Sequence, residues 1–377
     1  MREALLAIGT RKGLFLARSS DGSPFAVQPV RFSTVGVHAV AIDTRGHVPR
    51  VLAAIEYGHF GPSIMWSDDL GETWNEAQRP PVAFPDHTGA TLTRIWQITP
   101  SPTEPGVVWA GAEPGALFRS EDGGKTYSLV QGLWNHPHRP QWQPGGGGLC
   151  LHTVVPHPKD SAKLGIAVSA AGFYRSDDGG QTWEAANRGI RAPFLPEGGQ
   201  FPEFGQCVHK VAQHPAHPDR LYLQHHFGVY RSDDFGGTWT SIGDDLPSDF
   251  GFPVVVHPTK PDTVFVLPLE SDMDRVPVDH RYRVFRTDDA GDTWHAYTRG
   301  LPEPPVHASV LRDAMSASPA GLFFGTRDGE VYGSRDDGET WTRIARHLPD
   351  VLTVRSAILP SVREPGFMSG TNQRMGS

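Results

Sequence analysis

The sequence has little cysteine, no long apolar run and no cluster of basic residues. Cys150 and Cys207 are the only cysteines among 377 residues, so a scaffold built on several disulfides is excluded and a reducing compartment is favoured. No apolar run approaches the ~20 residues of a membrane-spanning helix, which predicts no membrane partner. The net charge is −8, with no basic tract, which argues against nucleic acid as a partner.

The first ten residues lack the apolar core of a signal peptide and have the pattern of a β-strand. Together with the scarce cysteine, this start predicts a cytoplasmic location. The chain is rich in turn-forming residues, with 42 glycines and 34 prolines. A globular chain with this many turn residues is expected to be all-β.

An eight-residue motif recurs about every ~50 residues along the chain. It has the form Ser/Thr-x-Asp-x-Gly-x-Thr-aromatic, and it occupies residues 67–74, 120–127, 176–183, 232–239, 287–294 and 334–341, with a degenerate copy at 19–25. The Asp and Ser side chains bond backbone N–H groups in a turn, while the Gly supplies backbone angles that other residues resist. Each copy therefore predicts a hairpin turn between two strands.

The motif resembles the Asp-box, or BNR repeat, of the sialidase-like propellers. Seven copies predict an all-β, seven-bladed β-propeller with four-stranded blades. The first blade lacks an initial strand, and the strand expected at 353–358 has no partners after it, so we expect the C-terminal strand to complete the N-terminal blade. The propeller is predicted to be one domain over residues 1–362, followed by a disordered tail at 363–377.

The loops of a propeller emerge on two faces, and the longer loops of this chain share one of them. These loops include 79–93, 131–149, 188–206 and the insertion 267–283. Since function concentrates in long loops on a rigid scaffold, we expect the site at this mouth of the channel. Aligning the first strand of each blade by its terminal Pro places one column of side chains near that mouth: His38, Trp96, His152, His209, Phe252, Asp313 and Arg355.

Two neighbouring blades carry the same Cys-x-His pattern, at Cys150-Leu151-His152 and Cys207-Val208-His209. Side chains at i and i+2 of a strand share a face. One hypothesis is therefore a metal-dependent enzyme with ligands His38, His152, His209, Cys150 and Cys207. Zinc, iron and copper all suit such ligands. In the alternative interpretation, these histidines and cysteines are packed core residues that repeat because the blades repeat.

The remaining candidates concern a small-molecule or carbohydrate ligand. Asp313 is the candidate acid or base, and Arg355 the candidate partner of an anionic substrate. The resemblance to sialidases implies arginines on a substrate carboxylate and a phenol nucleophile, for which Arg94, Arg312, Arg355 and Tyr57 are the matching residues. A glycosidase that uses Asp313 with Glu113 or Glu270 is a related alternative. Candidate substrate-binding residues are Trp96, His225, His226, Phe252 and Arg312. A third hypothesis is a propeller that binds or assembles partners without catalysis.

Overall fold

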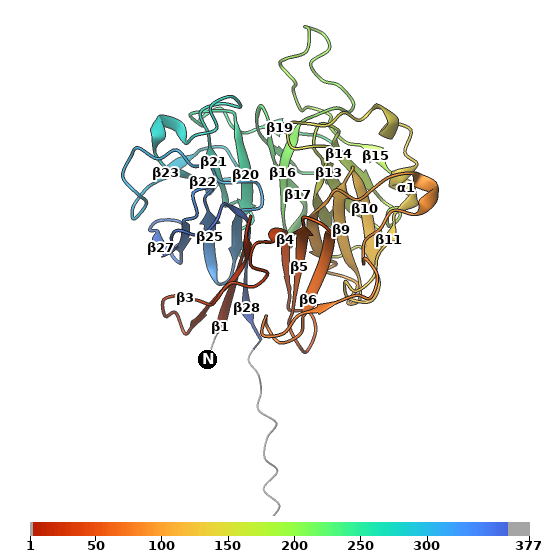
Figure 1. Ribbon diagram of the computed structural model, residues 1–377. Helices are drawn as coiled ribbons and strands as arrows, with labels where there is room; N and C mark the ends of the chain where they lie inside the picture. The colour runs from red at the N-terminus through yellow and green to blue at the C-terminus, as the bar shows by residue number, and fades with distance from the viewer. Residues whose placement is uncertain (1–2, 361–377) are drawn as a thin grey trace, which may run out of the picture.

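The computed structural model describes residues 3–360, which form seven four-stranded antiparallel sheets in a closed ring (Figure 1). The first strand of each sheet contacts the first strands of both neighbouring sheets, in the cyclic order β28, β4, β8, β12, β16, β20 and β24. These strands therefore surround the ring axis, and the sequence prediction of seven blades is confirmed.

The blades are numbered here in chain order, and each is given from its inner to its outer strand. Blade 1 holds β28 (Val351–Leu359), β1 (Glu3–Thr10), β2 (Gly13–Ser20) and β3 (Ala26–Val27). Blade 2 holds β4 (Gly36–Asp43), β5 (Arg50–Tyr57), β6 (Gly61–Ser67) and β7 (Asn75–Glu76). Blade 3 holds β8 (Arg94–Pro100), β9 (Val108–Glu113), β10 (Ala116–Ser120) and β11 (Ser128–Leu129). Blade 4 holds β12 (Leu151–Pro156), β13 (Leu164–Val168), β14 (Gly172–Ser176) and β15 (Glu184–Ala185).

The last three blades follow the same order. Blade 5 holds β16 (Val208–His214), β17 (His217–His225), β18 (Gly228–Ser232) and β19 (Thr240–Ser241). Blade 6 holds β20 (Gly251–Val256), β21 (Val264–Pro268), β22 (Val284–Thr287) and β23 (His295–Tyr297). Blade 7 holds β24 (Met315–Ser318), β25 (Gly321–Gly325), β26 (Val331–Ser334) and β27 (Thr342–Ala345). Short helical turns lie in the loops: η1 (Asp86–Thr88), α1 (Gln131–Trp134), η2 (Arg139–Gln141) and η3 (Val278–His280).

The two ends of the described chain close the ring within blade 1. Strand β28 pairs antiparallel with β1, from Glu3 opposite Leu359 to Thr10 opposite Val351, and the two lie side by side in Figure 1. This pairing confirms that the C-terminal strand completes the N-terminal blade, so β1 has no open edge. The tail predicted at 363–377 lies outside the described residues.

The Asp-box turns have the hydrogen bonds that their sequence predicts. In the box of blade 4, the carboxylate of Asp178 accepts bonds from the backbone N–H of Thr182 at 2.9 Å and from its hydroxyl at 2.6 Å. The Ser176 hydroxyl oxygen accepts the N–H of Gly180 at 2.9 Å. The box glycine also permits close packing between blades. At Gly71, which has φ 92°, a Cβ atom would lie 2.1 Å from Leu16.

Two of the tryptophans that end the boxes form a hydrogen bond to the preceding blade. Trp239 of blade 5 donates its indole N–H to the Ala186 carbonyl of blade 4 at 2.8 Å. Trp294 of blade 6 makes the equivalent bond to Ile242 of blade 5 at 2.7 Å. Both rings are buried, so each satisfies its polar group while packing against the preceding blade. Within residues 3–360, no helix has the length and apolar character that a membrane crossing requires.

Candidate functional site

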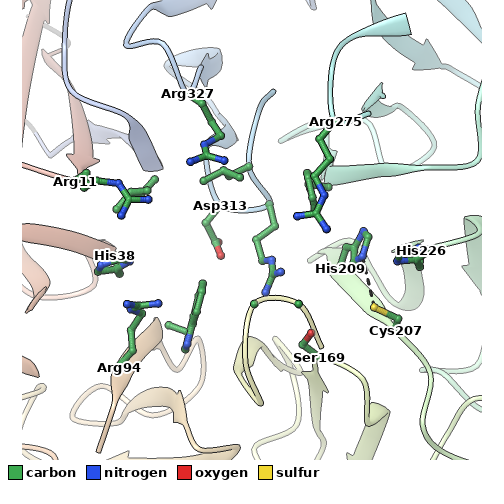
Figure 2. Close-up of a pocket in the computed structure, with 17 residues that line it drawn as sticks. Arg11, His38, Arg94, Ser169, Cys207, His209, His226, Arg275, Asp313 and Arg327 are labelled. Atoms are coloured by element: carbon green, nitrogen blue, oxygen red, sulfur yellow. Dashed lines mark hydrogen bonds between the residues drawn. The ribbon is translucent and has the colours of Figure 1, made fainter. Parts of the chain in front are cut away.

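A cavity of about 380 Å³ lies at one mouth of the central channel (Figure 2). Its walls come from the inner strands and from the loops that join the second strand to the third, or one blade to the next. This is the face that the loop lengths predicted. The lining residues are Arg11, His38, Arg94, Trp96, Gly146, Gly147, Ser169, Cys207, His209, His226, Phe252, Arg275, Leu311, Arg312, Asp313, Arg327 and Leu352.

Five of the seven side chains in the predicted column sit at β-bulges in the inner strands. The pairing of the first and second strands skips a position at His38, Trp96, His152 and His209, and again around Phe252. A bulged residue is left unpaired and its side chain is redirected. In four of these blades the redirected side chain lines the cavity, while His152 is fully buried outside it.

Asp313 is held by two cations beneath the cavity floor. Lys210 Nζ lies 2.7 Å and Arg355 Nη2 2.5 Å from the same carboxylate oxygen. Burial alone would raise the pKa of Asp313, but the charges and hydrogen bonds of Lys210 and Arg355 hold it well below its usual range. Burial also lowers the pKa of Lys210. Asp313 is therefore a fixed anion, and Arg355, which lies outside the cavity lining, is committed to it.

Five arginines line the cavity, and Asp313 is the one carboxylate among the lining residues that the structure describes. Figure 2 shows Arg11, Arg94, Arg275 and Arg327 around an open centre. Three of the five form ion pairs with carboxylates that do not line the cavity. Arg94 meets Glu56 at 2.6 Å, whereas Arg11 and Arg327 share Asp350, at 3.4 and 2.9 Å.

His38 also contacts Glu56, at 3.0 Å. The hydrogen bond from His38, together with Arg94, lowers the pKa of Glu56 to about 2 against the opposing effect of burial. His38 is thus engaged by a carboxylate, and Glu56 links the two lining residues His38 and Arg94.

Arg275 and Arg312 differ from the other three arginines, because neither has a carboxylate partner within residues 3–360. Arg275 donates to the Asp272 backbone carbonyl at 3.0 Å, and its guanidinium lies over Phe252. Arg312 reaches Cys150 Sγ at 3.3 Å and lies over Trp96, as Arg94 also does. Both guanidinium groups therefore retain most of their hydrogen-bonding capacity towards the cavity.

The predicted metal ligands separate into two groups. Both ring nitrogens of His152 are occupied, by the Thr153 hydroxyl and the Val208 carbonyl, each at 2.9 Å. Burial and the nearby Arg312 keep the pKa of His152 well below its ordinary value, which fits the packed-core interpretation for this residue. Cys150 is buried against Arg312.

Cys207 and His209 are brought together, with Sγ and Nε2 at 3.7 Å, and His226 joins them. The three residues offer ligand atoms that all lie within 4.8 Å of one another. Burial lowers the pKa of both histidines. His226 had been assigned to substrate binding, and its membership of this group was not predicted from the sequence.

Two other candidates lie away from the cavity. Tyr57 ends β5 and its ring packs near Phe60, so it is not in position to act as a phenol nucleophile there. His225 is fully buried, with Nδ1 accepting the N–H of Phe227 at 3.1 Å, and burial lowers its pKa to about 3. Both side chains contribute to packing beside the site.

Lys210, Arg275 and Ser169 lie at the site but were not predicted from the sequence. Lys210 had a detectable signal, because it is a charged residue in the middle of an inner strand, between His209 and Val211. Arg275 lies in the insertion that was expected to carry function, but nothing in the local sequence distinguishes it from Arg281 or Arg283. Ser169 lies in a short turn between β13 and β14 without a distinguishing pattern.

Comparisons with known proteins agree with this architecture. The model of the BNR/Asp-box repeat matches residues 174–185. The chain is 26% identical to a xyloglucanase of Hypocrea jecorina over 347 residues, which cover 76% of this chain and 37% of that protein. It is also 26% identical to a xyloglucanase of Paenibacillus sp over 332 residues, covering 76% and 30%. The chain thus spans about a third of the length of these relatives.

Two solved structures share the fold. YCF48 bound to D1 peptide has a TM-score of 0.52 at 14% identity, covering 86% of this chain and 87% of that one. An ancestral GH74 enzyme has a TM-score of 0.51 at 14% identity, covering 85% and 38%. The repeated motif, the match of residues 174–185 to the BNR/Asp-box repeat and the closed ring of seven blades together show a β-propeller built from Asp-box repeats.

Proposed function

We propose that the cavity binds a small anionic molecule and that an acidic sugar is its ligand class. The observation that carries this proposal is the pair Arg275 and Arg312. Both guanidinium groups face the cavity without a carboxylate partner in residues 3–360, and the lining carboxylate, Asp313, is already neutralised by Lys210 and Arg355. The cavity therefore has a surplus of positive charge inside a chain whose net charge is −8.

Guanidinium groups suit this role because their planar donors match the geometry of carboxylate and phosphate groups. The field inside a concave site also raises the local concentration of an oppositely charged ligand. A volume of about 380 Å³ lies in the range of small-molecule sites, which is roughly 300–1,000 Å³. A ligand about the size of a monosaccharide or disaccharide would fit.

The sugar part of the proposal is supported by the xyloglucanase relatives. The aromatic rings of Trp96 and Phe252 also line the cavity, and such rings commonly pack against sugar faces. Arginine guanidinium groups already lie over both rings, so an incoming sugar would meet a charged edge beside each ring. This arrangement favours a sugar that carries an acid group over a neutral one.

Calorimetric titration with D-glucuronate and D-glucose tests the proposal, since the two probes differ in the carboxylate. We expect D-glucuronate to bind and D-glucose to bind at least ten times more weakly. Arg312→Met removes a charge-assisted hydrogen bond worth about 1.5–3 kcal/mol, which corresponds to about 10- to 100-fold weaker binding. The exposed Arg346, outside the cavity, provides the control Arg346→Met. Equal affinity for the two sugars, or equal effects of the two variants, would exclude an anion site here.

Hydrolysis of a glycosidic bond is the second candidate, and the same relatives favour it. Asp313 remains ionised, as a nucleophile or charge-stabilising group must be. Glu113 is not a lining residue, but it accepts the indole N–H of the lining residue Trp96 at 2.9 Å, and we take it as the candidate proton donor. Glu270 is exposed and does not line the cavity. Turnover of 4-nitrophenyl glucuronides, lost in Glu113→Gln and retained in Glu270→Gln, would support this assignment, and turnover that survives Glu113→Gln would reject it.

A further inference from the structure

We propose that Cys207, His209 and His226 bind a transition-metal ion, with zinc as the first choice, at one edge of the cavity. All three residues line the cavity, and Figure 2 shows them together, away from Arg11 and His38. Cys207 immediately precedes β16 of blade 5, His209 lies near the start of that strand, and His226 lies in the turn after β17 of the same blade. This proposal is independent of the anion site, because it concerns different side chains and a different probe.

The separations of the ligand atoms are close to those of a tetrahedral zinc site. Bond lengths of about 2.3 Å to sulfur and about 2.0–2.1 Å to nitrogen place a sulfur and a nitrogen ligand ~3.6 Å apart at a tetrahedral angle. Cys207 Sγ and His209 Nε2 are 3.7 Å apart. The widest separation in the group is within 4.8 Å, so a metal would require a shift of about 1 Å. His226 is the first residue of a turn, where a movement of this size does not break the pairing of a strand.

His209 is held in the tautomer that a metal needs. Its Nδ1 lies 2.6 Å from the Gly251 carbonyl oxygen, which accepts a hydrogen bond and cannot donate one. The proton is therefore on Nδ1, and the lone pair of Nε2 points towards Cys207. A hydrogen bond from the second ring nitrogen to a backbone carbonyl is the usual support of a metal-binding histidine. The ring is also confined between Phe250 and Phe252.

Asp272 supports His226 in a similar way. Its carboxylate lies 3.2 Å from His226 Nε2, so it orients the ring and adds negative charge next to the proposed ion. The residue belongs to the long insertion of blade 6, whereas the three ligands belong to blade 5. The insertion is therefore long enough to bring Asp272 to a proposed metal ligand of the neighbouring blade.

The local charges are compatible with a bound cation once the thiol is ionised. Arg275 and Arg312 line the same cavity and repel a divalent ion. The thiolate and Asp272 together supply two negative charges. Three protein ligands leave a fourth position on the cavity side, which is typical of catalytic zinc sites. The bound ion would therefore face the volume occupied by a ligand.

Cobalt binding by untagged protein tests the proposal, because Co²⁺ reports a thiolate ligand through its charge-transfer absorption. We expect stoichiometric Co²⁺ with that absorption, and displacement by Zn²⁺. Cys207→Ser should abolish the thiolate band, whereas Cys150→Ser, which changes the other cysteine, should retain it. Asp272→Asn should weaken binding about 10- to 100-fold, as outer ligand partners generally do.

Thermal unfolding of metal-free Cys207→Ser shows whether the variant is folded, and His226→Gln at the turn provides a second test if it is not. Failure of the wild-type protein to bind Co²⁺ or Zn²⁺ stoichiometrically would overturn the proposal. So would a thiolate band that survives in Cys207→Ser or in His226→Gln. None of these outcomes depends on whether a sugar binds.

Discussion

Replacement of Asp313 by Asn is expected to destabilise the propeller far more than a typical polar substitution. The Asp313 side chain is 5% exposed, and its carboxylate compensates Lys210 and Arg355 at the centre of the ring. Removing one partner from a buried ion pair leaves uncompensated charge and costs about 3–5 kcal/mol. Here two cations lose the same partner, although Lys210 can release its proton, which limits the cost. We therefore expect a loss within that range.

Urea denaturation followed by tryptophan fluorescence measures the change, with the exposed Asp177→Asn as the control. A second substitution, Lys210→Met, should recover part of the loss in the Asp313→Asn background, because it removes one of the two unpaired cations. The double-mutant cycle isolates this coupling. A loss below about 1 kcal/mol, or additive effects of the two substitutions, would refute the buried-charge account.

The effect of Asp313→Asn on stability should depend on pH in a defined direction. The folded-state pKa of Asp313 lies below its unfolded value, so its contribution is fully present above the ordinary Asp pKa of about 3.9. The contribution is lost as the pH falls below that value, because the unfolded chain takes up the proton first. The stability difference between wild type and Asp313→Asn should therefore shrink below about pH 4.

Two further predictions follow from single contacts. Glu56→Gln should destabilise the protein at pH 7. The stability difference between wild type and this variant, measured by thermal unfolding, should decline from about pH 4.3 towards the folded pKa of about 2. A difference that stays constant over this range would contradict the contact of Glu56 with His38 and Arg94. Ser176→Ala should lower the free energy of unfolding by about 1–3 kcal/mol in urea denaturation, because the buried N–H of Gly180 loses its acceptor. The substitution Asp177→Ala at the exposed neighbouring residue should have little effect. Similar effects of the two substitutions would contradict the stabilising role of this hydrogen bond in the Asp-box turn.

The fold was predictable because the motif repeats and because strand pairing within a blade is local. Ring closure by residues 353–358 followed from the strand that blade 1 lacked, and β28 occupies that position. The column was predictable in part, since equivalent residues of a repeat occupy equivalent places: five of its seven members line the cavity, whereas His152 and Arg355 do not. Simple alternation along a strand does not describe this column, because five of the seven inner strands have a β-bulge there.

The details of the site were not predictable, because they depend on contacts between blades. His152 and His209 are equivalent in sequence, yet His152 has both ring nitrogens bonded while His209 has one directed at Cys207. Both rings meet the equivalent carbonyl of the next blade, but His152 meets it with Nε2 and His209 meets it with Nδ1. Lys210 meets Asp313 across 103 positions of sequence, and local pattern carries no information about such a pairing.

The position of bound D-glucuronate in a crystal structure tests the central claim most directly. The account predicts that the carboxylate lies between Arg275 and Arg312, with the sugar ring inside the cavity near Trp96 and Phe252. A carboxylate directed into solvent, or a sugar bound on the opposite face of the ring, would contradict the claim that these two arginines define the site.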